Sequence, residues 1–129
     1  MLNELAKEVL AINEANGWGD KPHEVGTHLM LIVSELAEAM EADRKGRWCN
    51  IPENKENTIF DPRTFHPDNI HFAETFKENI KDRVEDEIAD TIIRCLDFCA
   101  RHKIDIDFHV KAKMEYNKTR GYHHGGKAY

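Results

Sequence analysis

The chain has 129 residues with a formal net charge of −6, and this length is typical of one globular domain with its own core. The acidic balance excludes a general electrostatic attraction to nucleic acid or to anionic membranes. No apolar run is long enough to cross a bilayer.

Cysteine usage and the opening residues favour a cytoplasmic protein. The three cysteines are an odd number and form no disulfide framework, which fits a reducing compartment. The opening stretch, MLNELAKEVLAINEANGW, is amphipathic and acidic, unlike a signal or transit peptide.

Two helices are predicted in the first third of the chain. Apolar residues recur at helical spacing from Leu2, so the first helix extends to about Ala15 and stops at Asn16-Gly17. Pro22 fits the first turn of a second helix, which is expected to end at Gly46.

The periodicity breaks after the second helix. Residues 47–69 contain three prolines and four asparagines and show no helical or strand period. We predict a long ordered loop here, within an insertion at about 47–78. Loops of this length are uncommon in compact domains and often lie near functional sites.

Helical patterning resumes after Asp68 or Asn69. It indicates either one long helix with a break or a short helix followed by a main helix over roughly 79–102. Asp105 or Asp107 can cap a last helix that extends to about Arg120, with a tail after Gly121. With no strand pattern, the sequence predicts a single all-α domain, a four-helix-type bundle.

Two glutamates interrupt the apolar stretch LIVSELAEAM of the second helix. At roughly 100° per residue, Glu35 and Glu38 share a face. The opposite face carries the stripe predicted to meet the main core: Leu29, Ile32, Val33, Leu36 and Met40. Because Leu31 and Ala39 flank the glutamates, this helix is expected to pack on both sides, with the glutamates lining a cleft.

A second acidic pair, Glu87 and Asp90, lies in VEDEIADTIIRCLDFC. It falls beside an expected core stripe of Val84, Ile88, Cys95 and Cys99. Antiparallel packing would bring four carboxylates together, which requires raised pKa values or a bound cation. Mg²⁺ and Mn²⁺ prefer such oxygen ligands. The alternative is a solvated acidic face, because Glu53 and Glu56 have the same spacing.

The most basic part of the chain is KAKMEYNKTRGYHHGGK. A metal cluster beside basic side chains is the combination that a polyphosphate needs. The alternative is a solvated C-terminus whose charges favour a helix end. The cationic residues of this stretch are Lys111, Lys113, Lys118, Arg120 and Lys127.

The chain resembles the MazG-like members of the all-α nucleoside triphosphate pyrophosphohydrolases in three motifs and their order. These motifs are SELAEAM, EDEIADTII and KMEYNKTRGYHHGGK. The resemblance implies cleavage of a nucleoside triphosphate to the monophosphate and pyrophosphate, in a homodimer or homotetramer. About fifty residues separate the two acidic motifs, more than the family usually has, so the insertion bears on substrate choice.

Roles for individual residues follow from the same resemblance. Mg²⁺, or Mn²⁺, would be bound by Glu35, Glu38, Glu87 and Asp90. Glu38 would take a proton from the attacking water on the metal. Phosphate oxygens would be held by Lys113, Asn117 and Arg120, and Trp18 with Asn13 would contact the base.

Two other classes of protein stay open on the sequence alone. A non-catalytic nucleotide or metal sensor on the same bundle would bind nucleotide without releasing product. A helical interaction protein would use its acidic face to meet a basic partner and would gain no stability from metal.

Overall fold

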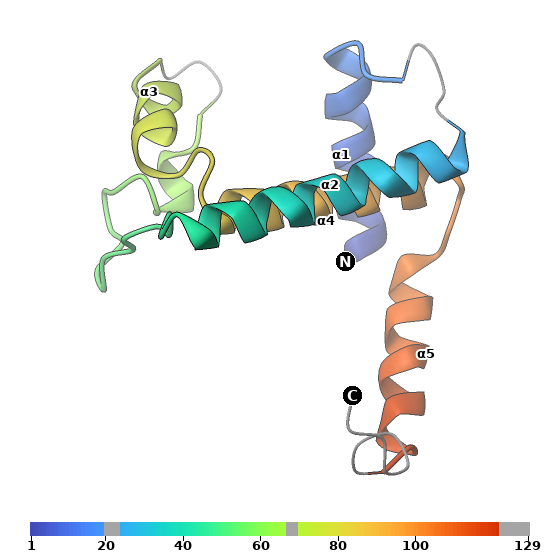
Figure 1. Ribbon diagram of the computed structural model, residues 1–129. Coiled ribbons are helices and arrows are strands. Elements are labelled where there is room, and N and C mark those ends of the chain that lie inside the picture. The colour runs from blue at the N-terminus through green and yellow to red at the C-terminus, as the bar shows by residue number, and fades with distance from the viewer. Residues whose placement is uncertain (20–23, 67–69, 122–129) are drawn as a thin grey trace. The chain divides into compact units, whose positions relative to one another are not determined.

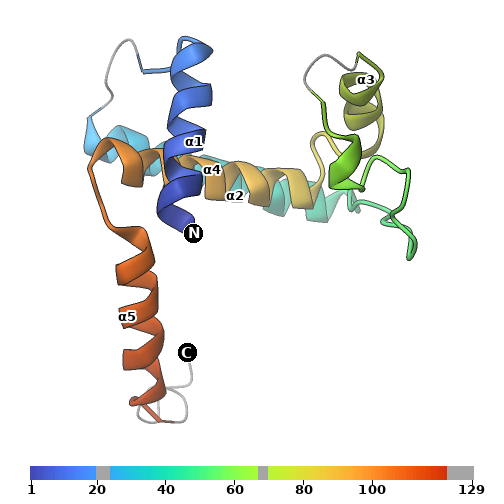
Figure 2. The same cartoon turned by 180° about the vertical axis from the view of Figure 1, so that it is seen from behind.

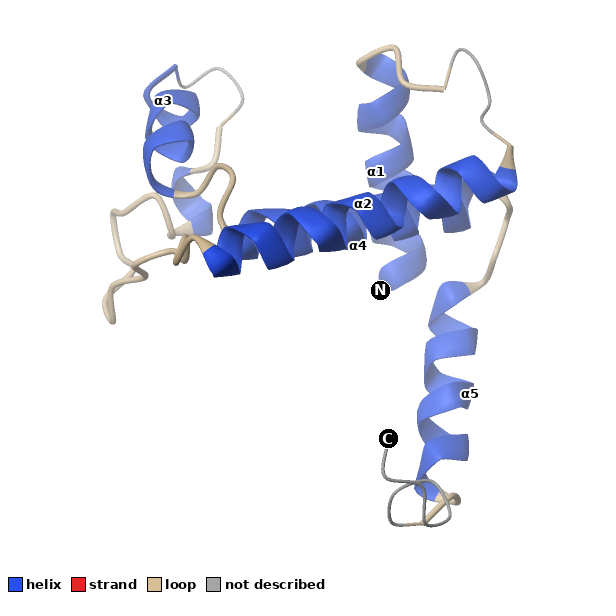
Figure 3. Ribbon diagram, in the orientation of Figure 1, coloured by secondary structure: helices blue, strands red, loops and turns tan. Residues whose placement is uncertain are grey.

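The computed structural model describes residues 1–19, 24–66 and 70–121 (Figure 1). These ranges contain five α-helices, one short 3-10 helix and no strand, which confirms the all-α class (Figure 3). Among the described helices, none combines the length and apolar character needed to cross a membrane. The elements are α1 Leu2–Ala15, α2 Val25–Arg44, η1 Pro62–Thr64, α3 Ile70–Asn79, α4 Val84–Arg101 and α5 Ile106–Lys118.

The chain divides into two compact units. Unit 1 comprises Met1–Glu24 and Ile93–Tyr129, and unit 2 comprises Val25–Ile92. The boundary between the units falls within α4, so each unit contains one half of this helix. Pro22 and the tail after Gly121 lie outside the described residues.

Glycine ends the first two helices as the sequence predicts. Gly46 has a φ of 66°, and the next backbone N–H, of Arg47, donates to the carbonyl of Ala42 at 2.8 Å. Gly17, with a φ of 80°, ends α1 in the same way. This left-handed cap satisfies carbonyls that the helix leaves without an intrahelical partner, and glycine adopts it without steric cost.

The predicted loop after α2 is ordered by a buried carboxylate and by aromatic contacts. Asp61, only 5% exposed, caps η1 and accepts from the Arg63 guanidinium at 2.7 Å. The ring centroids of Phe65 and Phe72 are 5.1 Å apart. The last part of the predicted insertion, 47–78, is helical, because α3 covers Ile70–Asn79.

Of the two arrangements predicted after Asn69, a short helix followed by the main helix is confirmed. The main helix begins at Val84 rather than near Asn79 because a turn separates α3 from α4. Asp82 has a φ of 60° in this turn, and its N–H donates to the Asp86 carboxylate at 2.9 Å. Asp86, in the first turn of α4, thereby fixes the turn that leads into the helix.

In unit 1, α1 and α5 cap each other. Asp105 accepts from the N–H of Phe108 at 3.1 Å, which confirms it as the cap of α5. Asp107 accepts instead from the N–H groups of Leu2 and Asn3, at 2.8 and 3.0 Å. The Asn3 side chain accepts in return from the N–H of Ile106 at 2.9 Å. Below these caps lies a small core of Ala6, Val9 and Leu96, with Leu2, Ala100 and Ile106 packed against it.

Of the two faces of α2 that were predicted to pack, the structure buries the glutamate face but not the apolar stripe. The buried residues of the helix are Glu35, Ala39 and Ala42, whereas the stripe expected to face the core is about half exposed. Ile32 is half-buried, and the exposed fractions of the other members are 45% for Leu29, 49% for Val33, 46% for Leu36 and 53% for Met40. A face of small residues allows close approach of a neighbouring helix, and apolar periodicity alone does not identify such a face.

The stripe expected on α4 is right only at its ends. Val84 and Cys99 are buried, but Ile88 and Cys95 are exposed. The additional buried residues of this helix are Glu87, Leu96 and Asp97. One stripe cannot describe α4 because its first half belongs to unit 2 and its second half to unit 1.

Replacing Asp107 with alanine leaves the N–H groups of Leu2 and Asn3 without their side-chain acceptor. We expect the free energy of unfolding to fall by about 1 kcal/mol, as for the loss of a helix cap. Urea unfolding followed by circular dichroism measures the change. Glu115→Ala is the control, because its ion pair with Lys118 is exposed and contributes little. Equal stability of the two variants would contradict the capping role of Asp107.

Candidate metal centre

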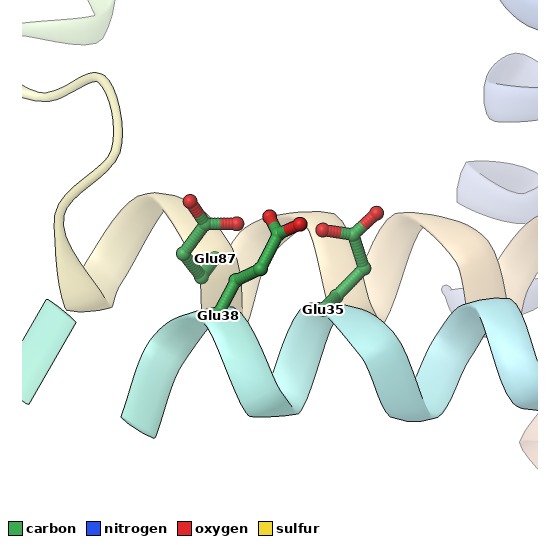
Figure 4. A group of neighbouring side chains, drawn as sticks. All are labelled: Glu35, Glu38 and Glu87. Carbon is green, nitrogen blue, oxygen red and sulfur yellow. The ribbon is translucent and has the colours of Figure 1, made fainter. Parts of the chain in front are cut away.

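Three carboxylates meet where α2 runs antiparallel to the first half of α4 (Figures 1 and 2). Glu35 and Glu38 extend from successive turns of α2, and Glu87 extends from the first turn of α4 (Figure 4). One carboxylate oxygen from each residue lies within 4.8 Å of the other two. We call Glu35, Glu38 and Glu87 the carboxylate trio. All three belong to unit 2.

Burial and repulsion raise the pKa of Glu87. This side chain is buried, with only 6% exposed, and burial disfavours its charged form. The charge of Glu38 and a hydrogen bond between the two carboxyl groups raise the pKa further, to about 7. Without a cation, therefore, a proton on Glu87 relieves the repulsion within the trio.

Glu85 shows that the raised pKa is specific to Glu87. Both residues lie in the first turn of α4, and burial raises the pKa of both carboxyl groups. For Glu85 the backbone N–H of Cys49 donates at 3.0 Å, and such bonds hold the pKa below its ordinary value. A nearby donor thus favours the charged form at Glu85, and nearby acids disfavour it at Glu87.

Asp90 lies outside the carboxylate trio. It is half-buried one turn beyond Glu87, and its charge contributes to the raised Glu87 pKa. The geometry thus brings together three of the four predicted ligands, and direct ligation by Asp90 stays a prediction.

The structure adds a second acidic group that the sequence reasoning missed. Asp82 and Asp86 each have an oxygen close to one of Glu87. However, Asp82 pairs with Lys81 at 3.0 Å, and Asp86 accepts the N–H of Asp82. Acids in a first helical turn are also favoured by the helix dipole, so this group has a structural explanation.

The donor set of the trio fits a hard divalent cation. All its ligand atoms are carboxylate oxygens, which Mg²⁺ and Mn²⁺ prefer over nitrogen and sulfur. Two of the three side chains, Glu35 and Glu87, are buried, whereas Glu38 is exposed. The trio is therefore anchored between two helices, with the Glu38 side chain at its solvent-accessible edge.

The other predicted site residues belong to unit 1. Asn13 donates from its side-chain amide to Asp97 at 2.9 Å, and Asp97 also accepts from Arg101 at 2.7 Å. Asn13 thus has a structural partner, while Trp18 is 60% exposed. Of the predicted phosphate ligands, Lys113 and Asn117 are exposed near the end of α5, and Arg120 is half-buried just beyond it. Their roles, like that of Trp18, stay predictions.

Comparison with known proteins adds no assignment, since no protein-family model, curated protein or solved structure matches the chain. The resemblance to MazG-like pyrophosphohydrolases therefore stays a prediction from the motifs. The geometry of the carboxylate trio is the observation on which a functional proposal rests.

The raised pKa of Glu87 predicts how stability changes with pH in the metal-free protein. The folded pKa is about 7 and the ordinary value is 4.5, so between them the folded chain holds a proton that the unfolded chain has lost. The free energy of unfolding should therefore fall as pH rises through this range. Urea unfolding in EDTA measures it. Glu87→Gln should remove this fall, and an unchanged slope in that variant would contradict the raised pKa.

Metal should stabilise the protein through the trio. We expect Mn²⁺ at a hundredfold excess over its dissociation constant to raise the free energy of unfolding by about 2.7 kcal/mol. EDTA should reverse the gain, and Glu35→Gln/Glu38→Gln should abolish it. Glu53→Gln/Glu56→Gln is the matched control, since this exposed pair has the same spacing and charge. Equal metal stabilisation of the two double variants would contradict the site.

Proposed function

We propose that the protein is a Mg²⁺-dependent nucleoside triphosphate pyrophosphohydrolase. It would cleave an NTP or dNTP between the α and β phosphates and release the monophosphate and pyrophosphate. The single observation that carries the proposal is the carboxylate trio on two antiparallel helices. The order of the acidic and basic motifs, which resembles the MazG-like enzymes, supports it.

The trio would supply the cation site of this reaction. Glu35 and Glu87, both buried, would anchor the cation, and Asp90 would complete its ligands. When bound, a divalent cation neutralises phosphate charge and lowers the pKa of water. At Glu87, the charge of such a cation would compensate the repulsion that a proton otherwise relieves.

Glu38 is the residue we assign to proton transfer. Its side chain is exposed, unlike those of Glu35 and Glu87, so water reaches its carboxylate oxygens. As the water oxygen bonds to the α phosphorus, the bond from that phosphorus to the oxygen bridging the α and β phosphates breaks. Pyrophosphate then leaves with the bridging oxygen. The proton from water passes to a Glu38 carboxylate oxygen, which acts as general base.

The basic end of α5 would hold the phosphate oxygens. Lys113 and Asn117, in the last turns of α5, provide a charge and an amide, and Arg120, directly after the cap residue Thr119, provides a second charge. Charged donors bind phosphate more strongly than neutral ones. On the same proposal, Trp18 would stack on the base, with its 60% exposed side chain as the contact surface.

An oligomer is part of the proposal, as a homodimer or homotetramer. The apolar stripe of α2, from Leu29 to Met40, is about half exposed. A contiguous apolar surface of this kind marks an interaction site in many proteins. A second copy of the chain would remove it from water and leave the trio on the other face of the helix.

Glu38→Gln tests both reaction and residue. Purified protein is incubated with Mg²⁺ and each common NTP and dNTP, and products are separated by chromatography. We expect monophosphate and pyrophosphate, suppressed by EDTA, and at least about a hundredfold lower turnover in Glu38→Gln.

Glu41→Gln is the matched control, because Glu41 is exposed one turn further along α2 and pairs with Lys45. Full activity of Glu38→Gln would contradict its role. Nucleotide that raises the melting temperature but gives no product would favour the sensor instead.

A further inference from the structure

The end of α5 carries two cations on one aromatic ring. Lys113 Nζ lies 4.9 Å from the centroid of the Tyr116 ring, and the guanidinium carbon of Arg120 lies 5.6 Å from it. Both distances are within the range of attraction between a cation and an aromatic face. Every residue of α5 from Phe108 onward is exposed, so no core holds Lys113 or Tyr116 in place, and Arg120, beyond the helix, is half-buried. The ring is the common element that brings them together.

Backbone geometry explains how Arg120 reaches the ring. Lys113 precedes Tyr116 by three residues, so the two lie on one helix face. Beyond the helix, the Thr119 N–H and hydroxyl both donate to the Tyr116 carbonyl, at 3.0 and 2.7 Å. The Arg120 N–H donates to Asn117 at 3.2 Å, which continues the turn and brings the guanidinium back over the ring.

Lys113 and Arg120 differ from the neighbouring Lys118 in their charge environment. Lys118 is paired with Glu115 at 2.7 Å. In the described part of the chain, neither Lys113 nor Arg120 has a carboxylate within ion-pair distance. Two like charges held on one ring repel each other, and an oxyanion bound by both would relieve that repulsion.

We infer that Tyr116 is a positioning residue that holds Lys113 and Arg120 as one binding site for a phosphate group. We call these three residues the Tyr116 clamp. The inference rests on the proposed function, because the phosphate would belong to the polyphosphate of the nucleotide. It adds a residue for which the motif resemblance gives no role. The ring acts by its face, so phenylalanine should replace tyrosine.

Binding of inorganic pyrophosphate in EDTA tests the clamp without the metal centre. Titration calorimetry at low salt compares the wild type with Tyr116→Leu and Tyr116→Phe. We expect Tyr116→Leu to weaken binding about fivefold to tenfold, and Tyr116→Phe by no more than about twofold. Lys111→Met should have an equally small effect, whereas Lys113→Met should weaken binding at least about tenfold. Circular dichroism confirms that each variant is folded.

A comparison of variants distinguishes a role of Tyr116 through the two cations from a merely structural role. If the ring acts through the two cations, Tyr116→Leu should change little in a chain that already carries Lys113→Met and Arg120→Met. In nucleotide hydrolysis, Tyr116→Leu should raise KM with kcat kept, since it weakens a contact made with the bound substrate.

The inference would be overturned if the wild type bound no pyrophosphate, or if Tyr116→Leu bound it as tightly as the wild type. Equal losses of affinity in Tyr116→Leu and Tyr116→Phe would also overturn it. So would an undiminished effect of Tyr116→Leu in the chain that lacks both cations. The proposed function fails by a different result. A chain that binds pyrophosphate through the clamp, but releases no product from any nucleotide, supports the clamp and contradicts the hydrolase alone.

Discussion

Repulsion among carboxylates between two helices is the constraint on which unit 2 depends. Glu35 and Glu87 are buried where α2 approaches α4, and Glu38 brings a third carboxylate close to both. Burial of ionised carboxylates is unfavourable unless a proton or a cation compensates them. The raised pKa of Glu87 indicates compensation by a proton, and the all-oxygen ligand set is suited to compensation by a hard cation. The contact between these two helices therefore also brings the three carboxylates together.

Small residues make that contact possible. Ala39 and Ala42 share the buried face of α2 with Glu35, so the helix meets its neighbour through short side chains. Its larger apolar residues, such as Leu36 and Met40, face away and stay about half exposed. The helix α2 therefore buries little apolar surface within the chain, and an apolar surface remains on its opposite side.

Local signals in the sequence were sufficient for the ends of elements and for the acidic faces. Glycine ends α1 and α2, Asp105 caps α5, and Glu35 and Glu38 share a face as their spacing predicts. Packing on the glutamate face of α2 was predicted, whereas the exposure of its apolar stripe was not, because hydrophobic periodicity alone assigns such a stripe to the core. The roles of Asn3 and Asp107 were equally hidden, since they cap helices that lie at opposite ends of the sequence.

The contact between α1 and α5 has a consequence for the order in which the protein forms on the ribosome. The bond from Leu2 to Asp107 joins residues 105 positions apart, and unit 1 is made from both ends of the chain. Unit 2 is one continuous segment, so it can fold as soon as it has emerged. The apolar face of α1 is covered only after its partners have been synthesised, which are Leu96 and Ala100 of α4 and Ile106 of α5. During translation, a folded carboxylate-bearing unit would thus precede completion of the small core of Ala6, Val9 and Leu96.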